Sequence, residues 1–165
     1  MANGDAPVGS LVVFDGRVVA EGVESVRLKS DVTAHAEIEA IRLACEKQQS
    51  LDLTGATLYT TVEPCWMCSC AIRRTNIGRV AFGSKNEEVG GVSSEFAVLR
   101  YTNVPNWDTV PLIEQDVLRG ECDALLRDFQ TRKLNRPSIK TFVGTSSIAL
   151  HIQVWTALTA TLLLP

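Results

Sequence analysis

The sequence has no excess of basic residues and no even set of cysteines. Its 165 residues include 16 Lys and Arg against 19 Asp and Glu, which gives a formal net charge of −3 and a pI near 5.4. Nucleic-acid-binding domains more often carry a basic balance, so this charge weighs against a large RNA partner. The 5 cysteines are odd in number and three of them cluster at positions 65, 68 and 70, which does not fit a secreted disulfide framework.

A secretory signal and an internal repeat are also missing. No basic segment followed by an apolar one opens the chain, so we expect a cytoplasmic protein. Residues 147–164 are apolar, but His151, Gln153 and several threonines interrupt them, so a membrane anchor is not expected. The composition changes at Pro137. We therefore predict one domain over residues 1–136, followed by an unrelated apolar, Thr-rich tail over 137–165.

Alternating strand-like and helix-like segments predict an α/β domain. Asp15-Gly16 is a strong hairpin signal between two apolar runs. Helical spacing of apolar residues indicates an amphipathic helix over 34–48 and another near the end of the domain. The expected strands are 8–14, 17–24, 56–62 (a central strand parallel to the first), 79–83 and 109–115, and the expected helices are 34–48, 65–75, a short one at 94–101, and 116–133.

Two short motifs carry the chemistry. Pro64-Cys65-x-x-Cys68 stands between a strand and a helix, and His35-x-Glu37 opens the preceding helix. Taken alone, the two cysteines fit a redox pair or buried thiols, and His35 fits a core histidine. Together, one histidine and two cysteines match a catalytic zinc site, which takes three protein ligands and leaves one position for water. The combination is the signature of the zinc nucleobase deaminases.

Glu37 is the residue that remains to move protons. It would take a proton from water and deliver it to the ring nitrogen and then to the departing amine. In a regular helix, positions i and i+2 point in nearly opposite directions, so this role requires the helix start itself to enter the site. A structural zinc site would need a fourth ligand, and Cys70 faces elsewhere on the helix, so an idle thiol is the expectation there.

At these residues the sequence resembles the cytidine deaminase-like superfamily, closest to the branch of tRNA-specific adenosine deaminases and related nucleoside and cytosine deaminases. The resemblance covers about residues 6–133. It implies a three-layer α/β/α sandwich around a five-stranded mixed β-sheet, one Zn²⁺ per chain, hydrolysis of an exocyclic amine to a carbonyl with release of ammonia, and a homodimer. The matching segments are 6–9, 33–37, 56–59, 63–68, 77–83 and 121–126.

The sequence departs from that family in three ways. The family begins with an amphipathic helix before the first strand, and here only a few residues precede Ala6. The position eleven residues before the zinc histidine is usually an Asn that hydrogen-bonds the base, and here it is Glu24. A carboxylate only accepts, whereas Asn both donates and accepts. Residues after 136 have no family counterpart. Glu24, Ala36, Glu63 and Pro64 are the substrate contacts that we expect.

Three functions follow from this pattern. The acidic balance, Glu24 and the pair Glu87-Glu88 favour a free nucleobase or nucleoside as the substrate. The alternative is a tRNA adenosine deaminase that forms inosine. Such an enzyme needs cations that bind phosphates, and residues such as Arg73 and Arg74 could supply them. A truncated or inactive deaminase-like subunit is the third reading, although an intact Glu37 argues against it.

Overall fold

The computed structural model describes residues 4–105, 107 and 109–134. The predicted tail over 137–165, with its apolar run, lies outside these residues. Among the helices of the described part, none is long and apolar enough to cross a membrane.

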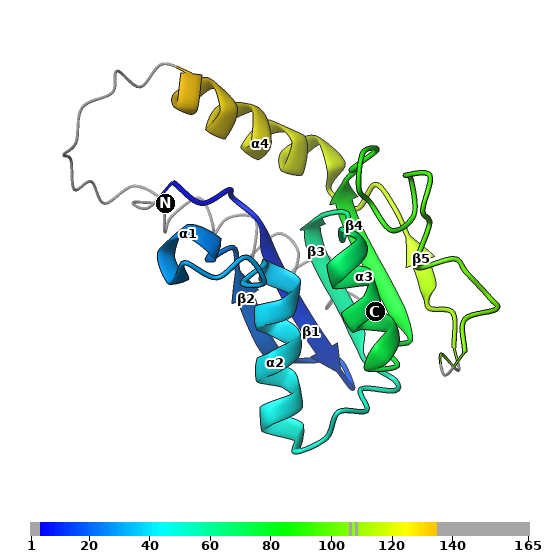
Figure 1. Cartoon of the computed structure of the whole chain (residues 1–165). Coiled ribbons are helices and arrows are strands. Elements are labelled where there is room, and N and C mark those ends of the chain that lie inside the picture. The colour runs from blue at the N-terminus through cyan, green and yellow to red at the C-terminus, as the bar shows by residue number, and fades with distance from the viewer. Residues whose placement is uncertain (1–3, 106, 108, 135–165) are drawn as a thin grey trace.

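The domain is built on a five-stranded mixed sheet with the strand order β2-β1-β3-β4-β5 (Figure 1). The β1–β2 hairpin turns at Asp15 and Gly16, which both have positive φ, as this turn requires. The strands are β1 (Gly9–Phe14), β2 (Arg17–Val23), β3 (Thr57–Val62), β4 (Arg79–Ser84) and β5 (Leu112–Glu114), and the helices are α1 (Val26–Lys29), α2 (Ala36–Gln48), α3 (Trp66–Arg74) and α4 (Arg119–Leu134).

The predicted direction of β3 is wrong. β3 is antiparallel to β1 and parallel to β4, and β4 is parallel to β5. The hairpin reverses the chain, so β2 is antiparallel to β1. A helical crossover normally returns the chain in the direction of the strand that it left, which here is β2. Because β3 takes the direction of β2, and β2 is antiparallel to β1, β3 is antiparallel to β1 although it lies on the other side of β1 from β2.

Helices cover both faces of the sheet, which confirms the predicted three-layer α/β/α sandwich. In Figure 1, α2 and α3 lie next to each other over one face and α4 lies away from both. The two faces alternate along each strand: Val12, Leu58 and Val80 belong to the large core beneath α2 and α3, whereas their neighbours pack on the other face. That second, smaller core is formed by Leu11, Tyr59 and Ala81, with Val13 and Val117 against it.

Two predicted helices differ in the structure. Residues 94–101 form turns rather than a helix, because their backbone groups bond to other segments: Leu99 N donates to Gly91 O at 2.9 Å. The last helix starts at Arg119 instead of residue 116, because Asp116 and Leu118 have φ of 64° and 50°, outside the right-handed helical region. The 109–115 strand is confined to Leu112–Glu114.

Candidate metal centre and active site

The three predicted metal ligands come from the starts of two helices. His35 is the residue immediately before α2, with φ −71° and ψ 152°, and Cys65 is the residue immediately before α3, with φ −67° and ψ 173°. Both residues are therefore extended, and only Cys68 lies within a helix. In a regular helix, His35 and Glu37 would point in nearly opposite directions. Here they can face the same site, because His35 is not part of the helical turn that carries Glu37.

The distances between the ligand atoms fit a tetrahedral zinc ion. Cys65 Sγ lies 3.6 Å from Cys68 Sγ and 3.7 Å from His35 Nδ1, and the three ligand atoms all lie within 4.8 Å of one another. Zinc with Zn–S bonds of about 2.3 Å and Zn–N bonds of about 2.0 Å would hold two sulfurs about 3.8 Å apart and a sulfur and a nitrogen about 3.5 Å apart. The two distances from Cys65 therefore match those that a bound zinc ion would impose.

The three ligand groups shift one another's pKa values. The sulfur–sulfur contact with Cys68 lowers the pKa of Cys65 to about 4. The hydrogen bond between His35 and Cys65 raises the pKa of His35 to about 9. The same sulfur–sulfur contact, with burial, raises the pKa of Cys68. Zinc binding requires a neutral histidine and two thiolates, so loading the site would release protons.

Glu37 is buried beside the three ligands. It is 3% exposed, and its Oε2 accepts a hydrogen bond from the Cys68 thiol at 3.5 Å. Burial raises the pKa of Glu37 to about 7, so its carboxyl can hold or give up a proton near neutral pH. Cys70 does not join the cluster: among the described residues, the group able to hold a metal is His35, Cys65 and Cys68.

Two hydroxyl groups of the sheet orient Glu37, and sequence reasoning did not predict them. Ser10 Oγ donates to Thr60 Oγ1 at 2.9 Å, and Thr60 Oγ1 donates to Glu37 Oε1 at 3.1 Å. Ser10 and Thr60 are both buried and pair across β1 and β3. The sheet thereby fixes the second carboxylate oxygen of Glu37. Small hydroxyl residues in adjacent strands are common, so only the register of β1 against β3 identifies this pair.

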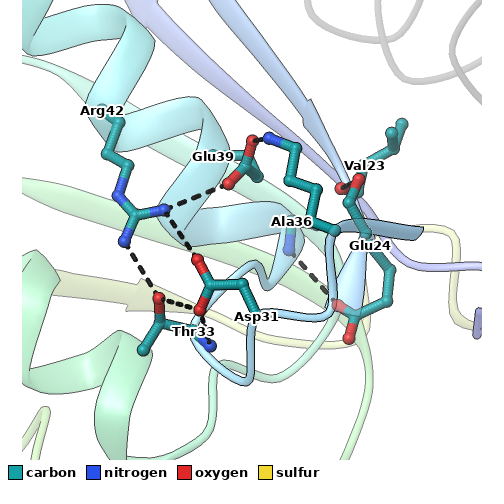
Figure 2. A network of polar contacts seen from close by, with 9 residues as sticks. Val23, Glu24, Asp31, Thr33, Ala36, Glu39 and Arg42 are labelled. Carbon is teal, nitrogen blue, oxygen red and sulfur yellow. Dashed lines mark hydrogen bonds and ion pairs between the residues drawn. The ribbon is translucent and has the colours of Figure 1, made fainter. Parts of the chain in front are cut away.

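Glu24 lies next to His35, where its carboxylate approaches the start of α2. Its Oε2 accepts a hydrogen bond from the backbone N–H of Ala36 at 3.3 Å, a contact drawn in Figure 2. Burial raises the pKa of Glu24, and the nearby His35 opposes that shift. The structure thus places Glu24 and Ala36 together at the site.

A polar network braces the segment that leads to His35. Asp31 Oδ1 accepts from both the backbone N–H and the hydroxyl of Thr33, at 2.8 and 2.7 Å. Figure 2 shows Arg42 of α2 reaching back to Thr33, Asp31 and Glu39. Such exposed ion pairs stabilise a fold little when taken singly. Here they link the 31–35 segment to α2 and so limit the freedom of His35.

Glu63 and Pro64, also predicted to contact substrate, are directed elsewhere in the structure. The Glu63 carboxylate accepts hydrogen bonds from three backbone N–H groups of the 86–93 segment. The Pro64 carbonyl accepts from Gly91 N at 2.8 Å and from the Ser69 hydroxyl at 3.2 Å. The substrate contact of these two residues stays a prediction.

Arg73 is a structural residue rather than a surface cation. It is 2% exposed, and its guanidinium donates to the carbonyls of Val98 and Tyr101 and lies 4.9 Å from the ring centre of Trp107. It connects Val98, Tyr101 and Trp107 to α3. Of the cations considered for phosphate binding, Arg74 on the same helix is exposed.

Comparisons with known proteins agree with this geometry. Residues 2–84 match the family model described as the cytidine and deoxycytidylate deaminase zinc-binding region. The chain is 38% identical to the tRNA-specific adenosine deaminase of Agrobacterium fabrum, over 78% of this chain and 83% of that protein. It is 37% identical to the tRNA-specific adenosine deaminase of Aquifex aeolicus, over 76% and 85%.

A solved structure extends the likeness to three dimensions. It comes from a study of A-to-I editing by tRNA:A34 deaminases at the wobble position of transfer RNA. It superposes with a TM-score of 0.65 at 38% identity and covers 72% of this chain and 84% of the other. The protein therefore belongs to the cytidine deaminase-like superfamily of zinc-binding hydrolytic deaminases, on the branch that holds the tRNA-specific adenosine deaminases.

Proposed function

We propose that this protein is a zinc-dependent tRNA adenosine deaminase that converts adenosine to inosine and releases ammonia. One observation supports it most directly. The chain is 38% identical to a tRNA-specific adenosine deaminase and carries the complete cluster of His35, Cys65, Cys68 and Glu37. These relatives favour tRNA over the free base or nucleoside that the acidic composition predicted.

The residues divide the work as follows. His35, Cys65 and Cys68 would hold one zinc ion per chain. When bound, zinc lowers the pKa of its water to about 7, which supplies hydroxide at neutral pH. Glu37 would take a proton from water through Oε2, the oxygen that faces the ligand cluster, and deliver it to the ring nitrogen. It would then move a second proton, from the hydroxyl group added to the base, to the leaving amine. Ser10 and Thr60 hold its other oxygen in place.

A free nucleobase or nucleoside is the second candidate, and Glu24 is the observation that favours it. One oxygen of Glu24 accepts the Ala36 N–H, and the other has no hydrogen bond to any described residue. An acceptor at the base site favours bases that present N–H groups there, whereas an Asn could also donate to an acceptor on the base. Ala36, Glu63 and Pro64 remain the other predicted contacts. A homodimer and a cytoplasmic location also remain proposals.

The test is ammonia release over a panel of substrates by the zinc-loaded protein. The panel contains a tRNA anticodon stem-loop with a target adenosine, the same stem-loop with guanosine in its place, and free adenine, guanine, cytosine and their nucleosides. We expect turnover of the adenosine stem-loop and inosine in the product. Turnover of a free base or nucleoside with none of the stem-loop would refute the tRNA proposal and favour the second candidate.

A further inference from the structure

The segment after β4 folds back onto the turn that carries Cys65. Trp66 N donates to Val89 O at 3.0 Å, and Gly91 N donates to Pro64 O at 2.8 Å. Between these two bonds, Cys65 and Gly90 form an isolated antiparallel bridge. The backbone around the first zinc-ligating cysteine is therefore paired on one side with residues 89–91, some 25 positions further along the chain.

Glu63 holds this segment from inside. It is 1% exposed, and its Oε2 accepts from Asn86 N at 3.0 Å while its Oε1 accepts from Val92 N and Ser93 N at 2.8 and 2.7 Å. Among the ion pairs of the described residues, none includes Glu63. A buried carboxylate is costly unless it is paired or hydrogen-bonded. The buried position of Glu63 and the folded position of the 86–93 segment therefore depend on each other.

The contact between the two segments leaves no spare room. A Cβ added to Gly90 would lie 2.3 Å from Glu63 Oε1, and one added to Gly91 would lie 2.0 Å from Ser69 Oγ. Both distances are far below van der Waals contact, so glycine is required for this close approach. The Ser69 hydroxyl meanwhile donates to Pro64 O at 3.2 Å. The turn before Cys65 is thus held by backbone, carboxylate and hydroxyl contacts together.

We propose that Glu63 is a positioning residue of the metal centre. Its carboxylate binds backbone N–H groups of the 86–93 segment, and this segment holds the turn before Cys65 so that the Cys65 sulfur lies beside His35 and Cys68. This rests on the proposed function, because it takes His35, Cys65 and Cys68 as a zinc site. It is an alternative to the direct substrate contact that the sequence predicted for Glu63. Since the carboxylate is buried and accepts three backbone N–H groups, its effect on the reaction passes through the metal.

The experiment measures the rate of zinc release to a colorimetric chelator from the zinc-loaded full chain. Glu63→Ala loses all three acceptor contacts, and we expect release about 10- to 100-fold faster, the usual cost of removing a residue that supports a metal ligand. Glu63→Gln keeps one carbonyl oxygen for Val92 and Ser93 but turns an amide nitrogen toward the Asn86 N–H. It should release zinc faster than wild type and more slowly than Glu63→Ala.

Asp5 provides a matched control, because it is a buried carboxylate whose backbone hydrogen bonds lie elsewhere. It is 8% exposed and accepts from Arg27 N at 2.6 Å and Leu28 N at 3.1 Å. Asp5→Asn should lower the melting temperature but release zinc at the wild-type rate. A second readout is the visible spectrum of the cobalt-substituted protein, which reports ligand geometry. It should change in the Glu63 variants and not in Asp5→Asn.

Two results would overturn the proposal. One is zinc release at the wild-type rate from Glu63→Ala or, if that variant does not fold, from Glu63→Gln. The other is a raised KM with unchanged zinc release and cobalt spectrum, which would return Glu63 to direct substrate contact. Zinc release needs no substrate. A protein that deaminates nothing on the panel therefore refutes the proposed function alone, and unchanged release refutes the role of Glu63 alone.

Discussion

Removal of the Thr60 hydroxyl is the sharpest test of how the sheet controls Glu37. Thr60→Val keeps the shape of the side chain and deletes the group that donates to Glu37 Oε1 at 3.1 Å and accepts from Ser10 at 2.9 Å. A hydrogen bond to a charged group contributes about 1.5–3 kcal/mol. If that energy holds Glu37 in its productive position, kcat falls about 10- to 150-fold at 1.4 kcal/mol per factor of ten.

Thr61 is a control that the chain itself offers. It is also buried in β3, and its Oγ1 accepts from Gly9 N at 3.2 Å, but successive strand residues face opposite sides of the sheet. Thr60→Val leaves the Ser10 hydroxyl without an acceptor, and Thr61→Val leaves the Gly9 N–H without one. Each variant should therefore lose about 1–3 kcal/mol of unfolding free energy. Only Thr60→Val should lose kcat beyond what its stability explains.

The assay is inosine formation under saturating substrate, with zinc content measured on the same samples and unfolding followed by urea titration. Ser10→Ala should lose less activity than Thr60→Val, because Thr60 can still donate to Glu37 when Ser10 is gone. Equal kcat losses in the Thr60 and Thr61 variants would mean that both act through stability alone. The hydroxyl chain would then have no role in orienting Glu37.

Three further variants test separate parts of the site. Glu37→Ala should keep its zinc by elemental analysis and lose at least about 100-fold in turnover, and substantial remaining activity would refute its role as the proton carrier. Glu24→Asn should change the ranking of bases on the substrate panel, and an unchanged ranking would show that Glu24 does not contact the base. Gly91→Ala should lower the melting temperature because of its clash with Ser69, and Ser69→Gly in the same chain should recover part of the loss; no recovery would locate the strain elsewhere.

Local features of the sequence predicted the parts of the fold that depend on local chemistry. Asp15-Gly16 fixed the position of the hairpin, and the apolar spacing of α2 fixed its length to within a residue or two. The direction of β3 was missed because the helical crossover sets it relative to β2, the strand that the crossover leaves, and not relative to β1, the neighbour of β3 in the sheet. The start of α4 was missed because a leucine at positive φ, here Leu118, has no sequence signal.

In the candidate site, too, the sequence predicted the residues that local spacing identifies and missed the roles that depend on distant contacts. His35, Glu37, Cys65 and Cys68 were identified because zinc chemistry restricts residue types and spacing, and the structure brings them together. The roles of Glu63, Thr60 and Arg73 depend on contacts between residues 23 to 50 positions apart. A buried glutamate that binds three amides has the same sequence signature as one that faces a substrate. Only the position of the 86–93 segment separates the two.

The relatives of this protein and the side chain of Glu24 favour different substrates: the relatives favour adenosine in tRNA, and Glu24 favours a free base or nucleoside. An ionised carboxylate accepts hydrogen bonds only, so it attracts a base edge that carries N–H groups and repels one that carries ring acceptors. The hydrogen bond from Ala36 N to Oε2 holds the side chain near the start of α2, and Oε1 has no hydrogen bond to a described residue, so Oε1 is the atom that we expect to meet a substrate. Adenosine in a tRNA loop fits this site if its exocyclic amine, rather than a ring nitrogen, is the group that meets Oε1. Glu24→Asn distinguishes these cases, because Asn can donate as well as accept and should widen the range of bases that the site deaminates.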